Sequence, residues 1–283
     1  MTALPLDHLV INTRFDTTLA EQIFTALGFT LTPRGHHAMG SVNHLMVFGD
    51  DYLELIGLPE TGKTLREEIL NSPVGIDGLV FKTDDADGVH AQLQAQGLPV
   101  QPLHAFVRPV DIEGQSFEAS FRTVRFVPGF FEAGRVYYCQ HLTPELIWRR
   151  AWRQHANRVK RLSALVIVSD ALVDDAERYA KAAGGLAVQA PDGTQRIESE
   201  RFCIELMDRA HYAALYGDLG CEGADRTSFF GAIKLRVDSA AALHQALDTV
   251  GDAVRYRKAS GRTYVQVPAF NTLLEFIHGD DAV

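Results

Sequence analysis

Three glutamates lie in stretches of sequence that otherwise predict buried strands. Glu54 lies in DDYLELIG, Glu205 in RFCIELMD and Glu275 in NTLLEFIHG. A carboxylate flanked by large apolar residues is costly to bury unless a cation or a hydrogen-bond donor pairs with it. The same setting at three places predicts a repeated structural unit, and it marks these carboxylates as candidate members of a site.

The elements that would position these carboxylates repeat four times along the chain. Each repeat predicts a strand, an amphipathic helix and three further strands. The first strands of the four modules are LDHLVINT, IDGLVFKTDD, LSALVIVSD and FFGAIKLRVDS. Helices of the first, second and fourth modules end at Gly28, Gly97 and Gly251, as expected for helix C-termini.

Several segments resemble the vicinal-oxygen-chelate superfamily, and its glyoxalase-like members in particular. LDHLVI, LGF and YLELIG resemble the first module of these proteins, and CQHLTPELIW is similar to a glyoxalase-like segment. The resemblance covers essentially the whole chain. It implies an α+β fold in which four tandem βαβββ modules pair into two cup-shaped mixed sheets. It is weak for the reaction, because the superfamily includes isomerases, lyases, dioxygenases, epimerases and metal-free binding proteins.

We expect the four modules to form two domains. Residues 1–150 would hold modules one and two, residues 151–161 a linker, and residues 162–283 modules three and four. The segment around the linker, WRRAWRQHANRVKR, is rich in arginine and tryptophan. The acidic charge of the whole chain favours a solvated linker helix there over a nucleic-acid site.

The resemblance implies metal ligands on the first and last strands of a module, at His8 and Glu54 in module one. An imidazole and a carboxylate on adjacent strands begin a ligand set for Fe, Mn, Ni or Zn. The third ligand would be His141 or Gln140, because a register shift of one residue turns the other to the opposite face. Such a metal could polarise neighbouring oxygens of a substrate. Without a metal, His8 and Glu54 could act as a general base and its orienting carboxylate.

The other modules lack a first-strand ligand. Gly78, Ala164 and Gly231 occupy the positions that correspond to His8. A metal in the second domain is therefore not expected, because two glutamates without an imidazole make a poor ligand set. We expect Glu205 and Glu275 to pair instead with an arginine such as Arg201, Arg236 or Arg262.

Further polar residues are candidates for binding a substrate. Arg122 and Arg125 in SFRTVRF could hold a carboxylate, although alternating arginines on an edge strand are as often surface residues. His44 in VNHLMVF and Tyr138 could face the same cup. Cys139 has no activating base in view, so it is not expected to be a nucleophile.

Residues 57–64, GLPETGKT, match the GxxxxGK[ST] pattern of a phosphate-binding loop. Glu60 would place negative charge beside the phosphates, and the chain lacks the alternating βα units of a parallel sheet. We expect these residues to connect modules one and two, with nucleotide binding as a remote alternative.

Composition predicts a soluble globular protein, with 46% hydrophobic residues and a net charge of −9. The acidic charge argues against binding to nucleic acid or to an acidic membrane. No apolar run approaches the roughly 18 residues that span a bilayer. Three cysteines without regular spacing predict no disulfide framework and a cytoplasmic location. Exposed sheet edges would allow a homodimer.

The leading hypothesis is a divalent-metal-dependent lyase, isomerase or dioxygenase that acts on a small oxygen-rich molecule in the first cup. The alternative is a metal-free protein of the same fold that binds and sequesters a small ligand. The combination of His8, Glu54 and His141 favours the enzyme, whereas the missing first-strand ligands favour the binding protein.

Overall fold

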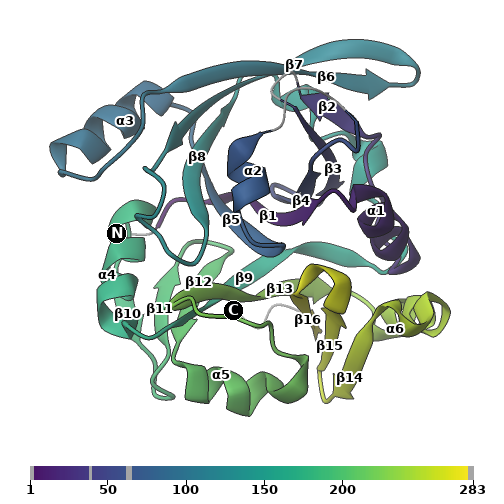
Figure 1. Ribbon diagram of the computed structural model, residues 1–283. Helices are drawn as coiled ribbons and strands as arrows, with labels where there is room; N and C mark the ends of the chain where they lie inside the picture. The colour runs from purple at the N-terminus through teal and green to yellow at the C-terminus, as the bar shows by residue number, and fades with distance from the viewer. Residues whose placement is uncertain (1–2, 38–39, 62–65, 280–283) are drawn as a thin grey trace.

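The computed structural model describes residues 3–37, 40–61 and 66–279. These residues form two eight-stranded mixed sheets with few helices, the α+β glyoxalase-like fold class that the sequence predicts. Figure 1 shows the two sheets one above the other, with α2 inside the curve of the upper sheet and α5 beneath the lower one.

The first sheet contains the strands and helices of modules one and two: β1 (Leu6–Arg14), α1 (Thr17–Ala26), β2 (Gly35–His37), β3 (Ser41–Val47), β4 (Tyr52–Gly57), α2 (Glu67–Asn71), β5 (Gly75–Lys82), α3 (Ala86–Ala95), β6 (His104–Ile112), β7 (Gln115–Arg125) and β8 (Arg135–His141). Two 3-10 helices follow, at Pro144–Leu146 and Arg150–Arg153.

The second sheet contains modules three and four: β9 (Val159–Ser169), α4 (Leu172–Ala183), β10 (Ala187–Gln189), β11 (Gln195–Glu198), β12 (Cys203–Met207), α5 (Arg209–Tyr216), β13 (Ser228–Val237), α6 (Ala240–Val250), β14 (Arg255–Ala259), β15 (Arg262–Val267) and β16 (Thr272–His278). Short 3-10 helices lie at Gly217–Leu219, Gly251–Ala253 and Pro268–Phe270. Strand β9 begins within the segment that we expected to be a linker.

The two sheets repeat one topology. The strand order is β2-β3-β4-β1-β5-β8-β7-β6 in the first and β10-β11-β12-β9-β13-β16-β15-β14 in the second. The first strand of each module runs parallel to its last strand, as in β1 with β4 and β5 with β8. The first strands of neighbouring modules pair antiparallel, β1 with β5 and β9 with β13. Module one therefore pairs with module two, and module three with module four.

The helices begin and end where local signals place them. Helix α1 buries Ala20, Ile23 and Phe24 on one face, which follows the spacing of an amphipathic helix. The Asp85 side chain caps α3 by accepting a hydrogen bond of 2.9 Å from the Gly88 backbone N–H. Helix α4 ends at Gly184, whose φ of 67° is the left-handed conformation of many C-termini. No helix among the described residues is long and apolar enough to span a membrane.

The phosphate-loop alternative does not agree with this fold. Gly57 is the last residue of β4, and the following strands pair in mixed sheets rather than in the parallel sheet of a nucleotide-binding domain. Residues 62–64 of the pattern lie outside the described residues.

Alternate residues of each central strand enter different cores. Leu9 and Leu53 project from one face of the first sheet into a core that also contains Leu165 of the second sheet. On the opposite face, Val10 and Tyr52 pack inside the first sheet, in the space that we call cup 1. The corresponding space in the second sheet, cup 2, contains residues such as Val166, Val168 and Tyr216. Because successive side chains of a strand point to opposite faces, each sheet contributes one face to the shared core and the other to its own cup.

The shared core predicts that the two sheets unfold together. Leu79 of β5 is fully buried in it, so Leu79→Ala should lower the free energy of unfolding by about 2–5 kcal/mol. Leu186→Ala, at a residue that is 65% exposed, should change it by less than about 0.5 kcal/mol. Urea unfolding followed by tryptophan fluorescence and by far-ultraviolet circular dichroism should give coincident transitions in each protein. Separate transitions for the two probes would contradict a shared core.

Candidate active site

His8 and Glu54 enter cup 1 from neighbouring parallel strands. In the register of β1 and β4, His8 lies opposite Tyr52 and Val10 lies opposite Glu54. This register puts His8 and Glu54 on the same face of the sheet, where both are buried. His8 Nε2 lies 3.7 Å from Glu54 Oε2, and the His8 ring stacks on the Tyr52 ring with centroids 4.3 Å apart.

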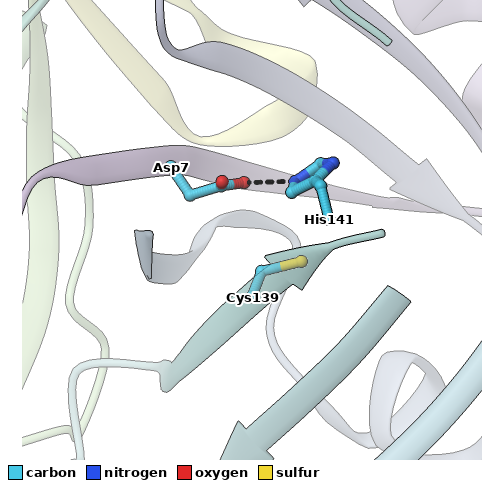
Figure 2. Close-up of side chains that lie close together, drawn as sticks. All are labelled: Asp7, Cys139 and His141. Atoms are coloured by element: carbon cyan, nitrogen blue, oxygen red, sulfur yellow. Dashed lines mark hydrogen bonds and ion pairs between the residues drawn. The ribbon is translucent and has the colours of Figure 1, made fainter. Parts of the chain in front are cut away.

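Asp7 joins His8 to His141, a role that the sequence analysis missed. Its Oδ1 lies 2.6 Å from His8 Nδ1 and 3.0 Å from His141 Nε2, the second of which Figure 2 shows. Strict alternation would turn Asp7 to the face opposite His8. The pairing of β1 with β5 shifts register between Leu6 and His8, and such an irregularity can re-aim a side chain.

The Asp7 carboxylate is ionised and fully buried. Burial alone would raise its pKa, but the charges and hydrogen bonds of His141 and His8 outweigh burial and hold the pKa well below its usual range. A carboxylate on Nδ1 keeps a proton on that nitrogen of His8, so that in the neutral imidazole the Nε2 lone pair points toward cup 1.

Glu54 and Tyr137 complete the surroundings of His8 Nε2. Asn43 Nδ2 donates a hydrogen bond of 2.6 Å to Glu54 Oε1, and the Tyr137 hydroxyl lies 3.2 Å from His8 Nε2. Burial raises the pKa of Glu54, but His8, His37 and the Asn43 bond outweigh it, so the net pKa is lowered. Burial raises the pKa of Tyr137, so its hydroxyl keeps its proton and can donate.

His8 and Glu54 fit a divalent metal as two of its ligands. Metal-binding imidazoles usually donate their other nitrogen to a carboxylate, and ligating carboxylates are themselves hydrogen-bonded. Asp7 and Asn43 supply these outer contacts here. The remaining coordination positions would be left to substrate or water.

The expected triad of His8, Glu54 and His141 is not brought together as one ligand set. Among the described residues, the cluster of ligand atoms close enough to share an ion is Asp7, Cys139 and His141 (Figure 2). This cluster is a poor set, because a metal binds the thiolate form and burial raises the pKa of Cys139 well above its usual value. In addition, Asp7 Oδ1 already bonds both imidazoles.

The structure decides between Gln140 and His141. Gln140 faces away from cup 1, where its side chain bonds the Asp84 carbonyl and the Ala86 backbone N–H at the start of α3. Gln140 is therefore not placed to be a ligand. His141 lies on the cup side, with its ring against the Phe121 ring at a centroid distance of 4.9 Å.

His44 and Tyr138, which we expected in the cup, lie on the faces of their strands that point away from cup 1. His44 Nδ1 lies 2.8 Å from the Thr32 carbonyl oxygen, and its Nε2 accepts a hydrogen bond from Arg34. Tyr138 is buried in the shared core, where its hydroxyl donates to the Ala182 carbonyl. In both cases the preceding residue takes the cup position, Asn43 in β3 and Tyr137 in β8.

Only one of the two predicted arginines lines the cavity. Arg122 makes a two-pronged bond to the exposed Asp87 carboxylate of α3, at 2.6 and 2.8 Å, outside cup 1. Arg125, three residues further along β7, lines the cavity and lies 3.3 Å from Glu68 of α2. The odd spacing of these arginines places them on opposite faces of the strand.

The cavity at the centre of cup 1 is small, about 50 Å³. His37, Arg66 and Arg108 line it in addition to the residues above. His37 was not singled out from the sequence. Its Nδ1 lies 3.0 Å from Ser41 Oγ, while its Nε2 is buried without a hydrogen-bond partner among the described residues. Burial lowers the pKa of His37 to about 4, so it is neutral at pH 7.

A larger cavity of about 630 Å³ adjoins the one in cup 1. The two share Arg66, Arg125 and Tyr137 in their walls. The larger cavity lies over α2 and the β7–β8 connection, whose apolar lining includes Val127 and Phe131.

Cup 2 is closed by internal ion pairs. Lys234 Nζ lies 2.7 Å from Glu205 Oε2 and 3.7 Å from Glu275 Oε2. Arg262 also pairs with Glu275, and the Tyr216 hydroxyl donates to Glu275 at 2.8 Å. The predicted arginine partner is confirmed for Glu275. Among the described residues Glu205 pairs instead with Lys234 of β13, the strand on the other side of β9.

Comparison with known proteins adds the family and the fold. The family model of the glyoxalase-like domain matches residues 6–183. No curated protein matches the sequence.

Three solved structures show the same fold at low identity. A hypothetical protein from Staphylococcus aureus has a TM-score of 0.69 at 12% identity, covering 98% of this chain and 100% of its own. A mutant of 4-hydroxymandelate synthase from Streptomyces coelicolor has a TM-score of 0.54 at 14% identity, with coverage of 98% and 93%. A xylose isomerase-like TIM barrel/4-hydroxyphenylpyruvate dioxygenase fusion protein has a TM-score of 0.58 at 13% identity, covering 100% of this chain but 50% of its own. At these identities, the likeness is one of fold alone.

Replacing Asp7 should destabilise the protein. Asp7→Asn removes the negative charge between two imidazoles, so we expect a loss of about 3 kcal/mol in the free energy of unfolding at pH 7. Folding lowers the pKa of Asp7, so its contribution is fully present above the unfolded pKa of about 3.9 and is lost as the pH falls through the lowered folded value. The difference between wild type and variant should therefore persist at pH 5 and shrink below pH 4.

Urea unfolding of wild type, Asp7→Asn and the exposed-site control Asp248→Asn at several pH values measures this difference. A loss at pH 7 no larger than that of Asp248→Asn would contradict a stabilising role for the Asp7 carboxylate.

Proposed function

Because the chain belongs to the glyoxalase-like domain family, we propose that cup 1 is the active site of an enzyme that acts on a small, oxygen-rich molecule. The proposed reaction is of lyase, isomerase or dioxygenase type and depends on a divalent metal: Fe, Mn, Ni or Zn. The observation that carries this proposal is the buried pair of His8 and Glu54, 3.7 Å apart at the wall of a cavity. The names of the synthase and dioxygenase neighbours agree with it, although fold alone does not define a reaction.

Each residue around the pair has a distinct part in this proposal. His8 Nε2 and one oxygen of Glu54 would hold the metal, while Asp7 and Asn43 fix the orientation of the two side chains. A bound metal would supply the positive charge that polarises two neighbouring oxygens of a substrate. The Tyr137 hydroxyl can donate a hydrogen bond to a substrate oxygen, because its buried phenol stays protonated. His37 Nε2 can bond a substrate group directly, since it lacks a partner among the described residues.

A second candidate is a metal-free site in the same cup. It is favoured by the two positions of module two that correspond to His8 and Glu54. Gly78 occupies the position of His8. Tyr137 occupies the position of Glu54, because Tyr137 lies opposite Val80 in module two and Glu54 lies opposite Val10 in module one. In this candidate, the Asp7 carboxylate orients His8 so that Nε2 acts as a general base or as an acceptor for a bound ligand.

Metal binding separates the two candidates. Tag-free protein would be dialysed to equilibrium against Mn²⁺, Fe²⁺, Ni²⁺ or Zn²⁺, and the bound metal measured by mass spectrometry. We expect about one ion per chain in the wild type, with Zn²⁺ or Ni²⁺ held more tightly than Mn²⁺. His8→Ala and Glu54→Gln should each lower the affinity by about 10- to 100-fold or more, because each removes one of two protein ligands.

The matched control is His36→Ala, at an exposed histidine of β2. It should bind as much metal as the wild type. If the wild type binds no ion under these conditions, or if the variants at His8 and Glu54 bind as well as His36→Ala, the metal-dependent function is wrong and the metal-free site remains.

A further inference from the structure

Arg108 is a buried cation without a counter-ion in the part of the chain that the structure describes. It lies in β6, is 7% exposed and lines the cavity of cup 1. Its contact is with the Phe121 ring, whose centroid lies 5.4 Å from the guanidinium carbon. Among residues 3–37, 40–61 and 66–279, no carboxylate or carbonyl oxygen makes a hydrogen bond or ion pair with it.

Several other cations around the two cups pair with carboxylates. Arg66 and Arg125, which also line the cavity, each pair with Glu68. In cup 2, Lys234 pairs with the half-buried Glu205 and Arg262 with the buried Glu275. A buried charge is strongly disfavoured unless a partner compensates it, and a ring face compensates only part of that cost. At Arg108, a bound ligand could therefore supply the negative charge that the described residues do not place beside the guanidinium.

Glu54 does not satisfy this requirement by direct contact. Its negative charge attracts Arg108, but its two oxygens are directed to Asn43 and His8, and it forms no ion pair with Arg108 among the described residues. The charged side chains that line the cavity are three arginines and one glutamate, in a protein whose net charge is −9. Because Glu68 lies beside Arg66 and Arg125, Arg108 is the lining arginine that is left to hold a small anion.

The surroundings of Arg108 favour an organic acid. A guanidinium presents parallel N–H groups that match the two oxygens of a carboxylate. Beside it, the Phe106 and Phe121 rings stack with centroids 5.1 Å apart and offer a flat apolar wall. A phosphate is usually held by several backbone N–H groups at a helix N-terminus or a turn, and here a single side chain faces an aromatic wall instead.

We propose that Arg108 binds the carboxylate group of the substrate, so that cup 1 selects small organic monoacids. This inference rests on the proposed function in that cup 1 is the binding site, but it does not require a metal. The acid group would lie against Arg108 with its carbon skeleton along the Phe106 and Phe121 rings, and the other end would point toward His8 and Glu54.

Benzoate and its uncharged analogue benzamide test the proposal on the full-length protein. Calorimetric titration should show that the wild type binds benzoate, with acetate as a smaller second probe, and that it binds benzamide about 10- to 100-fold more weakly. Arg108→Met should lower the affinity for benzoate by about the same factor and leave that for benzamide unchanged. Arg122→Met is the matched control, since Arg122 pairs with Asp87 outside the cup, and it should bind benzoate like the wild type.

Thermal unfolding shows whether Arg108→Met has lost binding or lost its fold. Because the variant removes an unpaired buried charge, the Tm of the ligand-free protein should stay the same or rise, and the rise in Tm that benzoate causes in the wild type should disappear. The proposal is overturned if the wild type binds neither benzoate nor acetate at millimolar concentration. It is also overturned if Arg108→Met binds benzoate like the wild type, or if its ligand-free Tm falls, which would make Arg108 a structural counter-charge to Glu54.

The metal experiment and this one fail independently. In His8→Ala, benzoate binding should persist even though metal binding is lost. Benzoate binding that depends on Arg108 in a protein that binds no metal would leave this inference standing and the metal-dependent function refuted. Metal binding without any binding of benzoate or acetate would support the metal-dependent function and refute the role of Arg108.

Discussion

The packing of the two sheets against one another decides which side chains are available to a site. Leu9, Leu53 and Leu79 of the first sheet share one core with Leu165 of the second. That core occupies one face of every central strand, so only the other face is left for chemistry. His8 and Glu54 lie in cup 1 because their neighbours, Leu9 and Leu53, are held in the shared core.

Within cup 1, the main constraint is the cost of keeping charged groups away from water. Asp7 is the most deeply buried of them, and it is compensated by His8 and His141 together. The same contacts set the tautomer of His8 and direct its Nε2 into the cavity, next to Glu54 and Tyr137. The contacts that compensate the buried Asp7 carboxylate therefore also orient the His8 imidazole.

The two cups use one fold in different ways. In cup 2, the last-strand glutamates Glu205 and Glu275 pair with Lys234 and Arg262, so that both of these carboxylates have a cation partner within the protein. In cup 1, Glu54 faces an imidazole and Arg108 faces an aromatic ring, so both signs of charge remain available to a ligand. The paired glutamates of cup 2 support a structural role for the second sheet. The charged groups of cup 1 that lack an oppositely charged partner are typical of a binding site. The difference arises from a few substitutions at matching positions of the two sheets. His8 pairs with Val80 in the first sheet, and Ala164 pairs with Lys234 at the same place in the second.

The sequence by itself determined the modules, the strand and helix periodicity, and the positions of His8 and Glu54 on the first and last strands of module one. These features depend on local patterns that the residues carry with them. Tertiary structure decided which of two adjacent residues faces the cup: His141 rather than Gln140, and Tyr137 rather than Tyr138. Strands buried on both faces are apolar throughout and do not show their inward face by alternation, and a shift of one residue exchanges the two faces. Asp7 reached the site through an irregularity in strand pairing, and Arg108 through the folding of β6 over the cup, because both depend on contacts between segments far apart in the chain.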